Sequence, residues 1–271
     1  MIYFKKPDSA IKKERIIMFK PDFSKNAQVA LGKSSMLKKD PLGYFVLSMM
    51  AGAFIGVGVL LAFTIGGQLD GQPYCKVIMG LSFGVALSLV VMAGGELFTG
   101  NNMVMAIGVM DRKVSISDSV KLWIICWLGN LAGAVILALL YHLTGLGAGP
   151  AGAFMAQGAL AKMTAGAVPL IARGILCNFL VCLAVWSAGR ATSDAGKLIM
   201  IFWCLFAFIT TGFEHSIANM TLMTVALLNP MEQAVTAGGY FYNLALVTFG
   251  NMIGGIFFVA LPYYIASRKD D

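Results

Sequence analysis

Charged residues are scarce in this chain of 271 residues: 12% are Asp, Glu, Lys or Arg, whereas 58% are hydrophobic. Soluble domains carry about 25% charged residues, so this chain lacks the polar residues needed to cover an apolar core in water. The shortage excludes a water-soluble domain, and the apolar content excludes a disordered chain. Leu42 to Ile65 carries no charge across 24 residues, long enough to cross about 30 Å of hydrocarbon as one helix. The sequence therefore predicts an integral, all-α membrane protein.

Residues and motifs for metal, nucleotide or hydrolytic chemistry are also missing. The chain has two histidines and five cysteines, the cysteines lie mostly inside apolar runs, and no Walker or HExxH motif occurs. We therefore expect no enzyme active site, no metal site and no cofactor, and the cysteines are expected to be buried without disulfides. An aquaporin-like pore for neutral solutes should show two Asn-Pro-Ala turns, but the chain has only Asn229-Pro230, followed by Met231.

Positive charge is concentrated before the first apolar run. Ten of the 20 Lys and Arg lie between Lys5 and Lys39, which indicates a cytoplasmic N-terminal segment and not a nucleic-acid-binding surface. This segment (1–40) precedes a predicted transmembrane domain (41–267), and its stretch from Ile11 to Phe19 is either an interfacial amphipathic helix or a solvated tail. With both termini inside, 17 of the 20 basic residues are cytoplasmic. The exceptions are Lys76, Lys162 and Arg173. A location in the cell inner (cytoplasmic) membrane fits this pattern.

Six apolar stretches predict six spans: 42–65, 76–110, 120–145, 166–189, 197–228 and 238–266. The second and fifth are too long for simple helices and carry polar residues near 94–102 and 210–216, which predicts two broken helices. Gly129-Asn130 in the third span recurs as Gly250-Asn251 in the sixth, and Glu96 and Glu214 lie in the two breaks. Because each half (about 41–146 and 163–267) has three spans, the halves must enter from opposite faces as an inverted repeat.

Ionisable residues within the bilayer are functional candidates. His215, in the second break, suits a site that protonates a passing weak-acid anion, although a hydrogen-bonded structural histidine is the alternative. Glu96 and Glu214 are expected to hold the broken segments by accepting backbone N–H bonds. Aromatic and aliphatic residues near the breaks are either apolar constrictions or ordinary packing residues: Phe83, Leu87, Phe98 and Phe208.

Three segments resemble the formate/nitrite transporter family, most closely its nitrite branch: Glu-Leu-Phe-Thr-Gly (96–100), Asn178 to Trp186, and Gly-Phe-Glu-His-Ser-Ile-Ala-Asn (212–219). The resemblance implies a homopentamer with an aquaporin-like pore in each protomer. It also implies a pore centre in which Thr99 faces His215, a vestibular cation at Lys162, and polar contacts from Asn178 and Asn251. Hydrophobic constrictions are implied at Phe83, Leu87, Phe98, Val181 and Phe208, and Asn219 is expected to support the second break with Glu214.

These expectations describe a membrane channel or transporter for small monovalent anions of weak acids. A bare anion pays a large desolvation cost in an apolar slit, whereas a proton passed through His215 would let the neutral acid cross. Nitrite is the favoured substrate, and hydrosulfide or formate is the alternative. The sequence leaves open whether the protein is a passive channel or a proton-coupled carrier.

Overall fold

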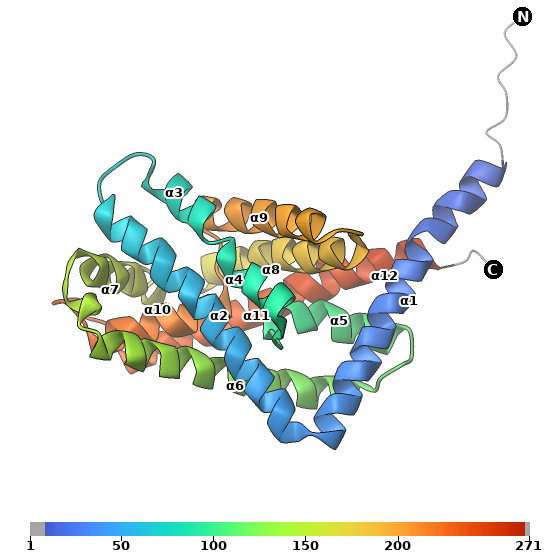
Figure 1. Cartoon of the computed structure of the whole chain (residues 1–271), viewed down its shortest axis with the longest axis horizontal. Helices are drawn as coiled ribbons and strands as arrows, with labels where there is room; N and C mark the ends of the chain where they lie inside the picture. Colours follow the sequence, from blue (N-terminus) through green and yellow to red (C-terminus); the bar gives the residue numbers. More distant parts are fainter. Residues whose placement is uncertain (1–8, 269–271) are drawn as a thin grey trace, which may run out of the picture.

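The structure is a computed structural model in which residues 9–268 are described, with side chains from Phe19 onward. The described chain is entirely helical (Figure 1), as predicted. Its elements are α1 (Ser9–Lys39), α2 (Pro41–Gln68), α3 (Cys75–Ser82), α4 (Val85–Leu89), η1 (Val90–Gly94), α5 (Phe98–Met110), α6 (Ile116–Leu143), η2 (Leu146–Ala148), α7 (Pro150–Met163), α8 (Ala167–Arg190), α9 (Asp194–Thr211), α10 (Ser216–Leu228), α11 (Ala237–Gly255), η3 (Ile256–Ala260) and α12 (Leu261–Ser267).

Six helical runs within residues 9–268 are long and apolar enough to cross a membrane: Pro41–Gln68, Cys75–Gly94, Ile116–Leu143, Ala167–Arg190, Asp194–Thr211 and Ala237–Ser267. They match the six predicted spans. The second combines α3, α4 and the π-helical turn η1, and the sixth combines α11, η3 and α12. Breaks separate η1 from α5 at residues 95–97 and α9 from α10 at residues 212–215, so the two long apolar stretches are broken as predicted.

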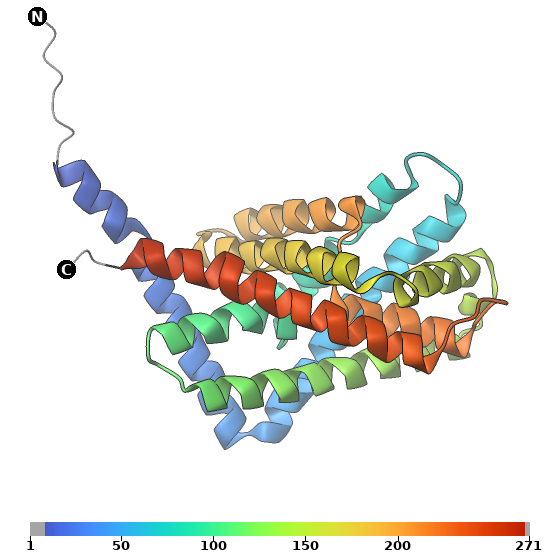
Figure 2. The same cartoon turned by 180° about the vertical axis from the view of Figure 1, so that it is seen from behind.

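The two halves form the predicted inverted repeat. The short helices α5 and α10 begin near the middle of the bundle and run toward opposite ends, which we name the α1 end and the α7 end (Figure 1). From behind, α11 to α12 and α6 run the length of the bundle as the last spans of the two halves (Figure 2). Each half also has a helix before its first span, namely α1 in the first half and α7 in the second.

Glycines permit the closest helix contacts. A Cβ at Gly129 of α6 would collide with Ser48 in α2, and one at Gly250 of α11 would collide with the backbone of Ile171 in α8. These two crossings occupy equivalent places in the two halves. The repeated Gly-Asn motif is therefore explained partly by packing, since only glycine lets these backbones approach so closely.

Polar caps explain where several spans begin. The side chains of Asp40, Ser115, Ser193 and Thr236 each accept a hydrogen bond from a backbone N–H of the first helical turn. Such caps satisfy donors that the helix itself leaves unpaired. The turns that carry these caps end the apolar runs, so the sequence encodes the span boundaries directly.

Helix α1 packs against the transmembrane bundle from Phe19 onward. Phe23, Ala27 and Ala30 are fully buried, and Ala30 lies against Gly108 of α5. The ring of Phe19 lies 5.6 Å from that of Tyr263 in α12. The second part of the basic segment is thus a packed helix and not a solvated tail. The alternatives for Ile11 to Met18 concern side chains outside the described residues.

Candidate functional site

Thr99 and His215 meet at the centre of the bundle. Thr99 lies in the first turn of α5, and His215 is the residue before α10, so the two breaks bring them together from opposite halves. Thr99 Oγ1 lies 3.1 Å from His215 Nε2. Both residues are buried, with 0% and 3% of their surface exposed.

A backbone hydrogen bond determines which ring nitrogen of His215 carries the proton. The N–H of Ala218 donates to His215 Nδ1 at 3.1 Å, so the imidazole caps α10. A backbone N–H can only donate, and Nδ1 must therefore accept. The proton of a neutral ring is then on Nε2. His215 presents an N–H donor to the centre of the bundle.

A vestibule of about 520 Å³ lies on the α7 side of this pair and extends to His215. The charged residues that line it are Lys76, Lys162, Arg173 and Glu214, and the aromatic ones include Phe83 and Phe208. Phe83 and Phe208 contact each other edge to face, with ring centroids 5.7 Å apart. Because the same two rings also line the next space inward, they lie between the vestibule and the centre.

Beyond the two rings the space shrinks to a central void of about 10 Å³, on the order of one water molecule. The void is lined by Ile55, Phe83, Leu87, Leu97, Val181, Leu205, Phe208 and His215. Four of the five predicted constriction residues are thus brought together around His215. Phe98 is not among them: it lines a separate apolar groove of about 330 Å³ with residues of α6 and α11. Its neighbour Leu97, which the sequence reasoning missed, lines the void.

The second break is held by a buried ion pair. Lys162 Nζ donates to Glu214 Oε1 at 2.8 Å, and 4% of the Glu214 side chain is exposed. The other carboxylate oxygen accepts from Asn219 Nδ2 at 2.7 Å. Asn243 joins this network by accepting from Asn219 and donating to the Lys162 carbonyl. Lys162 lies in the lining of the vestibule, where its charge is paired with that of Glu214.

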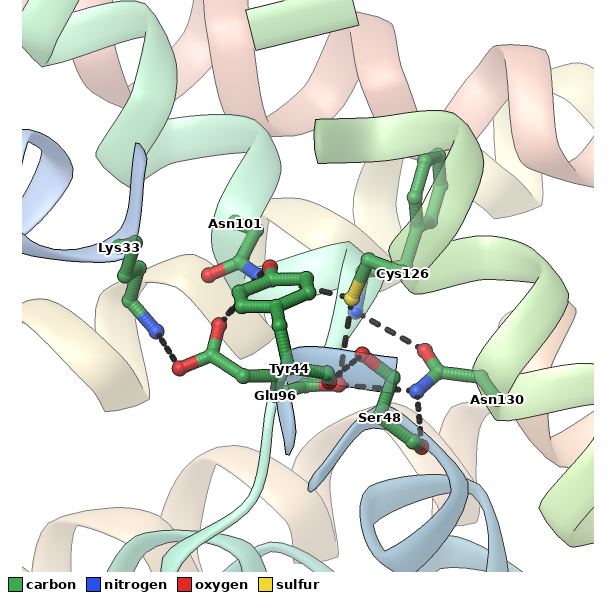
Figure 3. A network of polar contacts seen from close by, with 8 residues as sticks. Lys33, Tyr44, Ser48, Glu96, Asn101, Cys126 and Asn130 are labelled. Atoms are coloured by element: carbon green, nitrogen blue, oxygen red, sulfur yellow. Dashed lines mark hydrogen bonds and ion pairs between the residues drawn. The ribbon is translucent and has the colours of Figure 1, made fainter. Parts of the chain in front are cut away.

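An equivalent network holds the first break (Figure 3). Lys33 of α1 donates to Glu96 Oε1 at 2.5 Å, and the other carboxylate oxygen accepts from Tyr44 at 3.0 Å and from Asn101 at 2.9 Å. Cys126 contributes a thiol that bonds the Glu96 carbonyl at 3.2 Å. In both halves, a lysine from the helix before the first span forms an ion pair with the glutamate of the break.

Two asparagines bond the backbone of the breaks. Asn130 Nδ2 donates to the Glu96 carbonyl at 2.9 Å, and its Oδ1 accepts from the Phe98 N–H at 3.0 Å. Asn251 does the same in the second half, bonding the Glu214 carbonyl at 2.9 Å and the Ser216 N–H at 3.0 Å. These are the asparagines of the repeated Gly-Asn motif.

These bonds correct one expectation, that Glu96 and Glu214 accept backbone N–H bonds. The carboxylates of Glu96 and Glu214 accept from side chains, whereas the predicted backbone N–H donors are bonded by asparagines instead. Asn251 makes its polar contacts with the backbone of the break and does not line the central void. Asn178 lies behind Thr99 and donates to the carbonyls of Thr99 and Asn251 at 3.2 and 2.6 Å.

Sequence reasoning missed several residues that complete the site. They are Lys33, Tyr44, Leu97, Asn101, Asn130 and Asn243. The Gly-Asn repeat could have indicated Asn130, because its partner in the second half was selected. Lys33 carried no such signal, since it is one of ten basic residues before Asp40.

Comparison with known proteins agrees with this architecture. The family model described as "Formate/nitrite transporter" matches residues 24–265. The nitrite transporter NirC of Escherichia coli is 44% identical over 93% of this chain and 94% of its own length. A solved structure described as an FNT family ion channel has a TM-score of 0.88 and 41% identity, covering 92% of this chain and 99% of that one. A pentameric formate channel with formate bound has a TM-score of 0.74 and 29% identity, covering 84% and 98%. The chain belongs to the formate/nitrite transporter family.

Proposed function

We propose that the protein is a membrane channel for small monovalent anions of weak acids, and that nitrite is its main substrate. The observation that carries the proposal is His215, the single polar residue in the lining of the central void, whose buried ring is hydrogen-bonded to Thr99. Such a void favours a small species that is neutral or nearly so. Nitrite is favoured because the E. coli relative is named a nitrite transporter. Formate is the second candidate, since the formate-bound relative shares the fold, and hydrosulfide is a third.

The apolar walls set the main barrier. An anion that leaves the vestibule must pass Phe83 and Phe208 and then enter a void of about 10 Å³, where little of a hydration shell fits. Loss of hydration without replacement costs several kcal/mol or more for an ion. The Nε2–H of His215 supplies one replacement hydrogen bond when it exchanges its bond to Thr99 Oγ1 for one to the anion, and the Thr99 hydroxyl is a second group that can donate.

Proton transfer through His215 has a structural requirement. The ring gains a second proton only at Nδ1, which accepts from the Ala218 N–H. Charging the imidazole therefore breaks the cap of α10 and places a cation at a helix N-terminus, where the helix dipole opposes it. Proton-linked transport must couple each proton to a movement of this first turn, and the substrate anion provides the compensating charge.

The two lysine–glutamate pairs hold the breaks on either side of the centre. Lys162 and Glu214 lie at the inner part of the vestibule, beside His215, so the lysine can polarise a bound anion while its partner carboxylate keeps the local charge near zero. Lys33 and Glu96 occupy the equivalent place toward the α1 end. Each pair anchors the glutamate that lies two residues before its half-helix, α5 or α10.

We further infer a homopentamer in the bacterial inner membrane with both chain ends in the cytoplasm. The pentameric relative supports the assembly. Orientation rests on the basic residues, 17 of 20 of which would then lie on the cytoplasmic side. In this arrangement the vestibule of Lys76, Lys162 and Arg173 opens to the outside of the cell.

The test is uptake by purified protein in proteoliposomes, with nitrite, formate and hydrosulfide compared under imposed pH gradients. We expect nitrite uptake to exceed that of protein-free vesicles and to depend on pH. His215→Asn should lose most of this uptake. If none of the three anions enters faster than in empty vesicles, the proposed function is wrong.

A further inference from the structure

The vestibule contains more positive charge than its ion pair accounts for. Three cations line it, from three different helices: Lys76 in the first turn of α3, Lys162 at the end of α7 and Arg173 in α8. Glu214 is the one carboxylate among the lining residues. The lining therefore carries a net charge of about +2 with a neutral histidine.

Lys162 contributes little to this excess, because its ammonium lies 2.8 Å from the Glu214 carboxylate. Lys76 and Arg173 are exposed and form no ion pair within the described residues. Asp70, in the loop before α3, bonds the Gly71 N–H and does not line the vestibule. The uncompensated charge thus comes from Lys76 and Arg173.

Both residues also belong to the small set of basic residues that the positive-inside assignment does not place in the cytoplasm. The positive-inside assignment leaves only Lys76, Lys162 and Arg173 on the outer side, and all three line this one cavity. Basic residues on the outer side oppose the usual distribution of charge. Their convergence on the vestibule indicates a role there.

We propose that Lys76 and Arg173 form the outer anion-capture site of the channel and supply the uncompensated positive charge that the Lys162–Glu214 pair does not. The ligand is a small monovalent oxyanion such as nitrite or formate, held with part of its hydration shell before it passes Phe83 and Phe208. The proposal rests on the proposed function and names the residues that raise the anion concentration at the entrance.

The expected size of the effect follows from the size of the cavity. A sphere of 520 Å³ has a radius of about 5 Å, so an anion at its centre lies about that far from each wall charge. In water at this distance each uncompensated charge raises the local anion concentration about threefold at 0.01 M salt, about twofold at 0.15 M, and by less than a factor of about 1.5 at 1 M. Two charges together raise the local anion concentration about tenfold at 0.01 M salt, about fourfold at 0.15 M and less than about twofold at 1 M.

The experiment measures initial nitrite uptake against nitrite concentration in proteoliposomes, at several concentrations of an impermeant salt. Lys76→Gln with Arg173→Gln should raise the half-saturating concentration about tenfold at 0.01 M salt and less than about twofold at 1 M, with an unchanged maximal rate. Lys76→Arg and Arg173→Lys should behave like the wild type. Lys121→Gln, which removes an exposed cation from α6 near the α1 end, is the matched control.

A second measurement separates charge from shape. Arg173→Cys can be modified by thiosulfonate reagents carrying a positive, neutral or negative group. The wild type treated with the same reagents is the control. Its five cysteines are buried, so the reagents should leave its uptake unchanged. Only the positive reagent should restore low-concentration uptake, and the negative one should lower it further.

An unchanged half-saturating nitrite concentration in the double variant, or equal effects of all three reagents, would overturn the capture site. The proposed function would still stand if the wild type takes up nitrite. Failure of the wild type to transport any tested anion would instead refute the proposed function.

Discussion

The replacement His215→Asn separates the chemistry of the central residue from its structural role. The imidazole has two bonded nitrogens: Nδ1 accepts from the Ala218 N–H at 3.1 Å, and Nε2 lies 3.1 Å from Thr99 Oγ1. An asparagine Oδ1 occupies about the position of Nδ1 and is among the best helix caps. The variant should therefore keep the cap of α10 and lose only the donor that faces the centre.

The expected loss of stability is smaller than the expected loss of anion binding. Loss of one neutral hydrogen bond to Thr99 should lower the free energy of unfolding by about 1 kcal/mol, whereas His215→Ala also removes the cap and should lower it by about 2 kcal/mol in total. For an anion in the void, loss of a hydrogen bond to a charged group costs about 1.5–3 kcal/mol. That corresponds to a loss of uptake of about 10- to 150-fold.

The assay is initial nitrite uptake between about pH 5 and pH 8, with the unfolding midpoint and pentamer size measured on the same preparations. We expect His215→Asn to assemble normally, to take up nitrite slowly and to lose the pH dependence of the wild type. Wild-type uptake with an unchanged pH profile would refute the role of His215. If His215→Asn loses as much stability as His215→Ala, the asparagine does not cap α10. The argument that its Oδ1 replaces Nδ1 as the acceptor would then be wrong.

Two further predictions concern the vestibule and the constrictions. Lys162→Met leaves Glu214 unpaired in a buried position and should destabilise the protein by about 3–5 kcal/mol. The double variant Lys162→Met with Glu214→Gln should regain most of this stability. Equal unfolding midpoints for the single and the double variant would contradict the pairing. Phe208→Ala should admit larger monocarboxylates such as acetate, because the ring separates the vestibule from the void, while Phe98→Ala should lose about 3–5 kcal/mol of packing without a change in the acetate-to-nitrite flux ratio. Loss of selectivity in Phe98→Ala with normal stability would return that residue to the constriction.

Much of the fold followed from local signals in the sequence. Charge-free runs defined the spans, polar residues marked the breaks, and the Gly-Asn repeat related the two halves. These features are predictable because a bilayer leaves few ways to satisfy the backbone. The charge-free runs and the breaks each lie within about one span of chain, and the repeat compares two short local motifs, so no knowledge of tertiary contacts was needed.

The partners of the site residues were not predictable in the same way. Lys33 and Glu96 are 63 residues apart, and Lys162 and Glu214 are 52 apart. Nothing in the spacing distinguishes these lysines from other basic residues. Leu97 and Phe98 are adjacent apolar residues, and only the turn of the chain at the start of α5 decides which of them lines the void. Long-range pairing and side-chain direction were therefore the missing information.

The repeat also shows where symmetry is broken. Glu96 corresponds to Glu214, so Leu97 corresponds to His215, and both residues precede a half-helix and line the same void. His215 caps α10 with its side chain, whereas Leu97 provides no side-chain cap to α5. A leucine at a cap position gives up about 1 kcal/mol relative to asparagine, which indicates that an apolar wall opposite His215 is needed for selection. Leu97→Asn should therefore keep or increase stability, yet it should let hydrated anions pass and weaken the dependence of nitrite uptake on pH. Flux and unfolding measured together test this: a stabilised variant with the pH profile of the wild type would show that the wall at Leu97 does not control permeation.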